Sequence, residues 1–178
     1  CQRGGFRLTP VNWHLSTDEA EYIINDCDAK ALIAELRYPA ATEAKCPDVR
    51  IKLAFNGHAQ GFLDYHATIA KEDGSDIPDP TSGGQMLYTS GTTGRPKGVV
   101  HLHHDAPYTH ESYGRRVLGI REEDVVFSPP KIFFAYGFGN AITFPFSAGA
   151  ATLLLPGQPK PAAIFAAIER FRPTVFFG

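Results

Sequence analysis

Apolar residues in the first half of the chain follow two different periods, and each period predicts a type of element. Helical spacing follows a capping box at residues 16–19, which predicts a helix with its apolar face at Ala20, Ile23, Ile24 and Cys27. Strands are predicted at 31–34 and at 50–55. A second helical face is formed by Phe62, Leu63, His66 and Ile69. Residues 38–47 and 72–84 are polar or rich in breakers and are predicted to be loops.

In the second half, short apolar runs alternate with longer helical patterns. Strands are predicted near 85–88, 98–101, 125–128, 151–155 and 174–177. Helices are predicted near 104–116, 139–147 and 161–171, although Pro145 weakens the second of these. Pro161 fits a first helical turn, and Pro173 fits a stop. This alternation predicts an α/β fold with a largely parallel sheet flanked by helices.

Composition narrows the class of protein. The chain has 178 residues, of which 43% are hydrophobic and 20% charged, as in an ordinary globular domain. A formal net charge of −2 gives no electrostatic basis for binding nucleic acid or an anionic membrane, and no apolar run is long enough for a membrane span. Cys1, Cys27 and Cys46 lack zinc-like spacing. We interpret them as reduced thiols of a cytoplasmic protein, with one disulfide as the alternative.

The segment with the clearest chemistry is Thr89–Gly98, which follows an apolar strand. Its glycines allow tight folding and close approach to a ligand, and successive amides in such a loop form an anion-binding concavity. Lys97 adds a mobile positive charge. The predicted phosphate-binding residues are Thr89, Ser90, Gly91, Thr92, Thr93, Gly94 and Lys97. The simpler alternative is a flexible surface loop of small polar residues.

Other nucleotide-binding motifs fit less well. A Walker A loop requires Gly-Lys-Ser/Thr at its end, whereas here Lys97 lies between Pro96 and Gly98. Gly137-Phe138-Gly139 begins a dinucleotide fingerprint, but Ile142 stands where the last glycine belongs.

Residues 89–98 resemble the phosphate-binding signature of the AMP-binding, acyl-adenylate-forming superfamily. Residues 8–16 with Glu19, Tyr22 and Ile23 are similar to the segment upstream of that signature in fatty-acyl ligases. Residues 125–128 and 133–140 resemble benzoate–CoA ligases and their aryl-acid relatives. The resemblance implies that 1–178 is an internal piece of the large N-terminal AMP-binding domain. The two chain ends, which start at Cys1 and stop inside an apolar strand, agree with this expectation.

The resemblance implies a two-step reaction. A carboxylate, expected to be aromatic and benzoate-like, attacks the α-phosphate of ATP to give an acyl-adenylate, and coenzyme A then displaces AMP to give a thioester. ATP, Mg²⁺ and coenzyme A are the implied cofactors and co-substrates. Lys97 is the implied catalytic residue, because its charge stabilises the departing pyrophosphate. Phe134, Ala135, Tyr136 and Gly137 are the implied acid-binding residues.

Three alternatives to the aryl-acid ligase stay open: a fatty-acyl–CoA ligase, a peptide-synthetase adenylation domain and a non-catalytic nucleotide-binding module. The missing remainder of the chain is expected to hold the adenine, ribose and hinge contacts and the small C-terminal domain. We therefore expect the isolated piece to be inactive.

Several polar residues are interpreted without a role in the reaction. His101 and His103 form a conceivable metal site, but no metal site is predicted because convincing partner ligands are lacking. Asp105 is predicted to cap the following helix, and Lys131 is interpreted as solvated surface.

Overall fold

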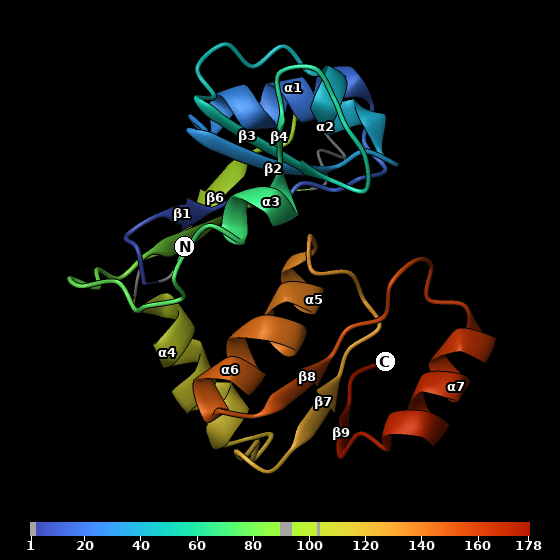
Figure 1. Cartoon of the computed structure of the whole chain (residues 1–178). Coiled ribbons are helices and arrows are strands. Elements are labelled where there is room, and N and C mark those ends of the chain that lie inside the picture. The colour runs from blue at the N-terminus through green and yellow to red at the C-terminus, as the bar shows by residue number, and fades with distance from the viewer. Residues whose placement is uncertain (1–2, 90–93, 103) are drawn as a thin grey trace. The chain divides into compact units, whose positions relative to one another are not determined.

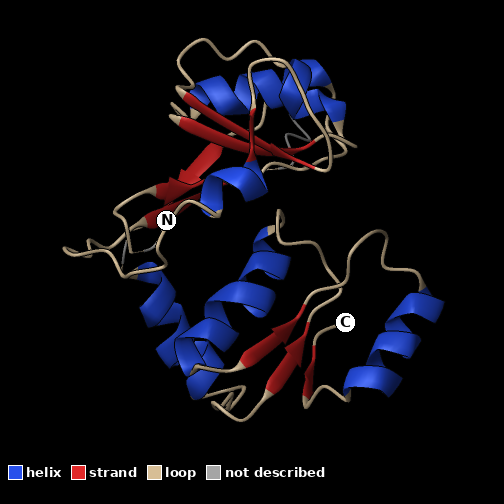
Figure 2. Ribbon diagram, viewed as in Figure 1, coloured by secondary structure: helices blue, strands red, loops and turns tan. Residues whose placement is uncertain are grey.

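The computed structural model describes residues 3–89, 94–102 and 104–178, which fold as two compact units (Figure 1). The N-terminal unit comprises Cys1–Val100 and the C-terminal unit His101–Gly178. Each unit contains strands and helices (Figure 2), and most strand pairs are parallel. The predicted α/β class is therefore confirmed.

One sheet of the N-terminal unit is fully parallel. Strands β2 (Ala31–Glu35), β3 (Ile51–Phe55) and β4 (Leu63–Asp64) lie in the order β2-β3-β4. Helix α1 (Thr17–Asp26) buries its apolar face against this sheet. The resulting core contains Ala20, Ile24, Leu32, Ala34, Ala44, Cys46 and Val49.

The capping box that predicts α1 is present. The Ser16 hydroxyl accepts a hydrogen bond from the Glu19 amide, and the Glu19 carboxylate accepts one from the Ser16 amide at 2.9 Å. These bonds satisfy two amides that have no partner inside the helix, so the chain has a defined point at which to begin the helix.

Two predictions in this unit were wrong in detail. The 38–47 segment contains a short helix, α2 (Pro39–Glu43), which begins with proline at a position where helices tolerate it. The helix predicted over 62–69 is shorter, because the chain first forms β4 beside β3. Helix α3 (Tyr65–Ile69) then starts at the Asp64 cap, whose carboxylate accepts from the Ala67 amide at 2.6 Å.

The second sheet of this unit has the order β1-β5-β6. Strands β1 (Arg7–Leu8) and β5 (Gly84–Tyr88) are parallel, whereas β5 and β6 (Gly98–Val100) are antiparallel. The antiparallel pair is a hairpin that carries the glycine-rich segment at its tip. Strand β6 ends at Val100, one residue before the predicted end.

The sheet of the C-terminal unit has the order β8-β7-β9 and is parallel throughout. Strands β7 (Val125–Phe127), β8 (Ala151–Leu153) and β9 (Val175–Phe176) are shorter than predicted but lie at the predicted places. Val126 and Phe127 of the central strand are completely buried. Helix α7 (Pro161–Phe171) begins and ends at the predicted residues.

The other two helical regions contain π-helical turns. The predicted 104–116 helix consists of α4 (Asp105–Thr109) and the π-helix η1 (His110–Arg115). The predicted 139–147 helix begins earlier and runs through α5 (Ala135–Phe138), η2 (Gly139–Thr143) and α6 (Phe144–Ala148). Pro145 directly follows the π-helical turns, where the regular i→i−4 hydrogen bonding is already interrupted. None of the helices in the described ranges is long and apolar enough to cross a membrane.

Candidate functional site

The glycine-rich segment of the N-terminal unit is closed at its base by a two-residue neck. The Thr89 amide donates to the Lys97 carbonyl at 3.1 Å, and the Lys97 amide donates to the Thr89 hydroxyl at 3.1 Å. Tyr88 and Gly98 pair directly below the neck in the β5–β6 hairpin. Thr89 and Lys97, the residues at which the chain leaves and re-enters the hairpin, are therefore fixed to each other.

Lys97 lies at the exit of this loop with an exposed side chain. Among residues 3–89, 94–102 and 104–178, no carboxylate forms an ion pair with its ammonium. Gly94, also exposed, has a φ of 152°, which side-chain-bearing residues rarely adopt. Both features suit a loop that receives an anion. Of the predicted phosphate-binding residues, Ser90, Gly91, Thr92 and Thr93 lie outside the described residues.

Helix α1 supports both sides of this hairpin. The Tyr88 hydroxyl donates to the Asp26 carboxylate at 2.5 Å, and the Arg95 guanidinium lies 5.2 Å from the centre of the Tyr22 ring. Burial and the neighbouring Asp26 carboxylate raise the pKa of Tyr88, so its hydroxyl remains a donor. Sequence reasoning missed these supports, since nothing in the local pattern links residues so far apart.

A separate candidate site belongs to the C-terminal unit, at the carboxyl end of β7. The chain leaves β7 at Phe127, crosses a loop and enters α5 at Ala135, with Phe134 in the cap position. Phe134 and Tyr136 are 52% and 53% exposed. Of the predicted acid-binding residues, Phe134, Ala135 and Tyr136 are thus open to a ligand, whereas Gly137 is buried.

Tyr136 reaches the end of a neighbouring strand. Its hydroxyl donates a long hydrogen bond of 3.4 Å to the Gly178 carbonyl, two residues beyond the end of β9. The ring of Phe134 contacts that of Phe133, with centres 4.7 Å apart. The exposed aromatic side chains therefore belong to a turn at the carboxyl edge of the sheet, which is where open parallel sheets bind their ligands.

Lys131 is not the solvated surface residue that the sequence indicates. Its ammonium is partly buried and donates to the Leu155 carbonyl at 2.6 Å, two residues beyond the end of β8. This burial lowers the pKa of Lys131. Lys131 follows two prolines and precedes an isoleucine, and this local sequence gives no indication of a contact with Leu155. The prediction of a solvated side chain was wrong for this reason.

Gly137 is needed for the packing of this same loop. A Cβ at Gly137 would lie 2.2 Å from the Lys131 carbonyl oxygen and 2.6 Å from that of Pro130. Because both neighbours are backbone atoms, they have little freedom to move aside. The loop after β7 and the first turn of α5 are therefore in direct backbone contact.

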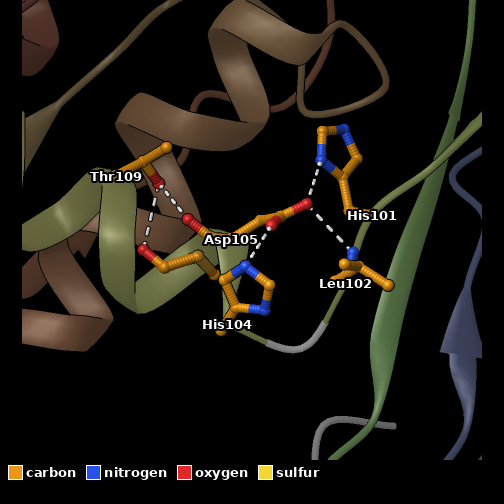
Figure 3. A network of polar contacts seen from close by, with 6 residues as sticks. His101, Leu102, His104, Asp105 and Thr109 are labelled. Carbon is orange, nitrogen blue, oxygen red and sulfur yellow. Dashed lines mark hydrogen bonds and ion pairs between the residues drawn. The ribbon is translucent and has the colours of Figure 1, made fainter.

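His101 and His104 belong to a polar turn that follows β6 (Figure 3). The Asp105 carboxylate lies 3.3 Å from Nδ1 of His101 and 3.4 Å from Nε2 of His104, and it accepts from the Leu102 amide at 2.9 Å. The Leu102 amide is the main reason why the pKa of Asp105 lies below its ordinary value. His104, not Asp105, occupies the cap position, so that prediction was wrong. His103 lies outside the described residues, within which no three metal-ligating side chains cluster.

Comparison with protein families gives one match along the whole chain. The family described as AMP-binding enzyme matches residues 1–178. The benzoate–CoA ligase of Thauera aromatica is 37% identical over 180 residues, an alignment that covers 99% of this chain and 34% of the relative. The 4-hydroxybenzoate–CoA/benzoate–CoA ligase of Rhodopseudomonas palustris is 34% identical, with the same coverage of both chains. The chain thus spans about a third of the length of these curated relatives.

Solved structures of similar proteins share the fold. An anthranilate–CoA ligase in complex with anthranoyl-AMP superimposes with a TM-score of 0.83 at 32% identity, covering 94% of this chain and 34% of that one. A benzoate–CoA ligase from Burkholderia xenovorans superimposes with a TM-score of 0.77, also at 32% identity and with the same coverage.

Proposed function

Because the chain belongs to the AMP-binding enzyme family, we propose that it is part of a ligase that activates an aromatic carboxylic acid with ATP. The acid carboxylate attacks the α-phosphate, and an acyl-adenylate and pyrophosphate are formed. The thiol of coenzyme A then displaces AMP, giving a thioester. Similarity to benzoate–CoA and anthranilate–CoA ligases supports the aromatic class, since it extends along 99% and 88% of the chain.

The single structural observation that carries the proposal is the closed neck below the glycine-rich loop. It fixes the backbone at Thr89 and Lys97, the two ends of the segment whose amides and hydroxyls suit an anion by residue type. We assign phosphate binding to Thr89, Ser90, Gly91, Thr92, Thr93, Gly94 and Lys97. The exposed Lys97 ammonium then faces the negative charge that grows on the pyrophosphate as it leaves.

Magnesium enters this scheme as part of the MgATP substrate. It neutralises phosphate charge and thereby favours attack by an anionic carboxylate. The proposal assigns no metal ligand to this chain. What the chain's own residues do is bind the phosphate groups and orient them, which lowers the barrier without a covalent protein intermediate.

The acid pocket is assigned to the turn that begins α5. The exposed rings of Phe134 and Tyr136 offer flat surfaces to an aromatic acid, and Ala135 between them is small. Gly137 contributes by letting the preceding loop lie against the helix. In a full-length ligase, this chain supplies the phosphate-binding loop and part of the acid pocket, and we propose that it does not turn over alone. Free thiols at Cys27 and Cys46 suit the cytoplasmic setting that we propose.

Product analysis of the full-length protein that contains this sequence tests the proposal. The protein is incubated with MgATP, coenzyme A and either benzoate-type or straight-chain acids, and thioester and AMP are measured by mass spectrometry. We expect equal amounts of aryl-CoA and AMP. Thioester formation with straight-chain acids alone would favour a fatty-acyl ligase. ATP binding without any thioester would favour a peptide-synthetase domain or a non-catalytic module.

A further inference from the structure

A hydrogen bond joins the loop between β7 and α5 to the carboxyl end of β8, a strand that comes later in the sequence. Lys131 lies in this loop, and its hydrogen bond to Leu155 joins residues 24 positions apart. Leu155 lies in the connection that leaves β8. The lysine therefore bridges the carboxyl ends of two adjacent parallel strands.

The order of the strands makes this place a point where successive connections run in opposite directions. From β7 the chain crosses to β8 on one side, and from β8 it crosses back over β7 to β9 on the other. Right-handed crossovers that run in opposite directions leave their helices on opposite faces of the sheet. Figure 1 shows α5 and α6 on one side of this sheet and α7 on the other. The two connections diverge at the carboxyl ends of β7 and β8, where parallel sheets open for ligands.

Lys131 is held there in an environment that disfavours its charge. Its pKa is lowered by burial, and in the described part of the C-terminal unit no carboxylate forms an ion pair with it. Its ammonium donates to the Leu155 carbonyl, and its own carbonyl packs against the Cα of Gly137. A partly buried ammonium needs compensation from such contacts. Its position thus fixes the loop from two sides, once by the side chain and once by the backbone.

We propose that Lys131 is a positioning residue for the acid pocket, because it clamps the loop after β7 to the end of β8. The clamp fixes the backbone three residues before Phe134 and, through Gly137, the first turn of α5. This inference rests on the proposed function in that the clamped turn is the one assigned to the aromatic acid. Lys131 touches no reacting atom in this scheme. It determines how tightly, and in which orientation, the aromatic ring of the acid is received.

Steady-state kinetics on the full-length protein test the clamp. Lys131→Met keeps the length and the apolar stem but cannot donate, and we expect it to raise the KM for the aromatic acid roughly ten-fold with an unchanged KM for ATP. Lys131→Arg retains a donor and is expected to restore most of the acid affinity. Lys160→Met is the matched control, because Lys160 is exposed in the same unit. Lys131→Gln is a second variant if Lys131→Met does not fold.

The outcomes separate this inference from the proposed function. If Lys131→Met changes the KM for acid and the KM for ATP equally, or leaves the KM for acid unchanged, the clamp is overturned. Wild-type activity with an aromatic acid would still support the proposed ligase function. If the wild type activates no aromatic acid, the proposed function fails. In that case, amide hydrogen exchange still tests whether the Lys131–Leu155 hydrogen bond holds the loop. Faster exchange at Phe134 and Phe138 in Lys131→Met would support the clamp, and unaltered exchange would overturn it.

Discussion

At the scale of single residues, Lys97 shows how a charge can be kept available for a ligand. It is exposed at the base of the glycine-rich segment, and its amide and carbonyl are fixed by Thr89. The backbone is thus anchored while the side chain is exposed, as the proposed contact with a phosphate group that changes position during reaction requires.

Lys97→Ala is expected to slow adenylate formation in the full-length protein by about 100-fold, the typical effect of losing one charged group that stabilises a transition state. The thermal unfolding midpoint is expected to stay unchanged, because the exposed side chain supports no core. Single-turnover release of pyrophosphate measures the first effect, and circular dichroism the second. Release at the wild-type rate would remove the role given to Lys97.

Tyr136 tests the assignment of the acid pocket. Its ring is half exposed and its hydroxyl bond to Gly178 is long, so the side chain is available to a ligand without being essential to the sheet. Tyr136→Ala is expected to change the relative kcat/KM for different aromatic acids by roughly ten-fold or more, with little effect on the KM for ATP. Tyr136→Phe, which keeps the ring, serves as the control. A variant that loses ATP affinity and keeps its acid preference would contradict the assignment.

At the scale of elements, glycine positions decide whether the β7 loop can pack on its helix. Gly137→Ala is expected to destabilise the fold by about 3 kcal/mol, since a methyl group cannot fit against the backbone of residues 130 and 131. Gly139→Ala is the matched control two residues further along, because its Cβ would meet only the Phe144 ring at 3.8 Å. Chemical denaturation compares the two. Equal free energies of unfolding for Gly137→Ala and Gly139→Ala would show that the loop after β7 can move aside to accept the methyl group.

The beginnings of β7 and β9 are joined by an acid-sensitive link. The Thr174 hydroxyl donates to the Asp124 carboxylate at 2.7 Å and accepts from the Val125 amide at 3.0 Å. The Thr174 hydroxyl and the Arg121 amide lower the pKa of Asp124 below its usual value. A lowered carboxyl pKa stabilises the fold above the usual value of about 3.9 and loses this effect as pH falls through the folded-state pKa.

Asp124→Asn is therefore expected to be less stable than the wild type at neutral pH. The difference should shrink as the pH is lowered below about 4, where the wild-type carboxylate also becomes protonated. Unfolding midpoints measured from pH 7 downward with both proteins test this. A difference that stays constant over the whole range would mean that the charge of Asp124 does not contribute.

The elements differ in how far the sequence predicts them. Helix α1 follows from local signals, because the Ser16–Glu19 capping box fixes its start and its apolar face is periodic. The π-helical turns of η1 and η2 carry no such signal. Within the C-terminal unit they depend on packing between distant residues, such as the Tyr113 and Phe144 rings, whose centres are 5.8 Å apart. The Lys131–Leu155 contact was missed for the same reason.

At the scale of the whole molecule, chemistry is divided between two units. The segment to which we assign phosphate binding belongs to the N-terminal unit, and the exposed aromatic turn belongs to the C-terminal unit. The residue types and order of the segment alone lead to that assignment, whereas the Thr89–Lys97 neck became visible only in the fold. Similarity to aromatic-acid ligases covers both units, including the first half, which by sequence resembles fatty-acyl ligases. Our proposal of an aromatic acid therefore rests on similarity along the chain rather than on any single local pattern.

Acid-dependent exchange of pyrophosphate into ATP by the full-length protein tests the central claim most directly, because it reports the adenylation half-reaction without coenzyme A. Benzoate-type acids are compared with straight-chain fatty acids, and Lys97→Ala is included as the phosphate-loop variant. The account predicts exchange that requires an aromatic acid and falls sharply in Lys97→Ala. Exchange driven only by fatty acids, or no exchange with either class, would contradict it.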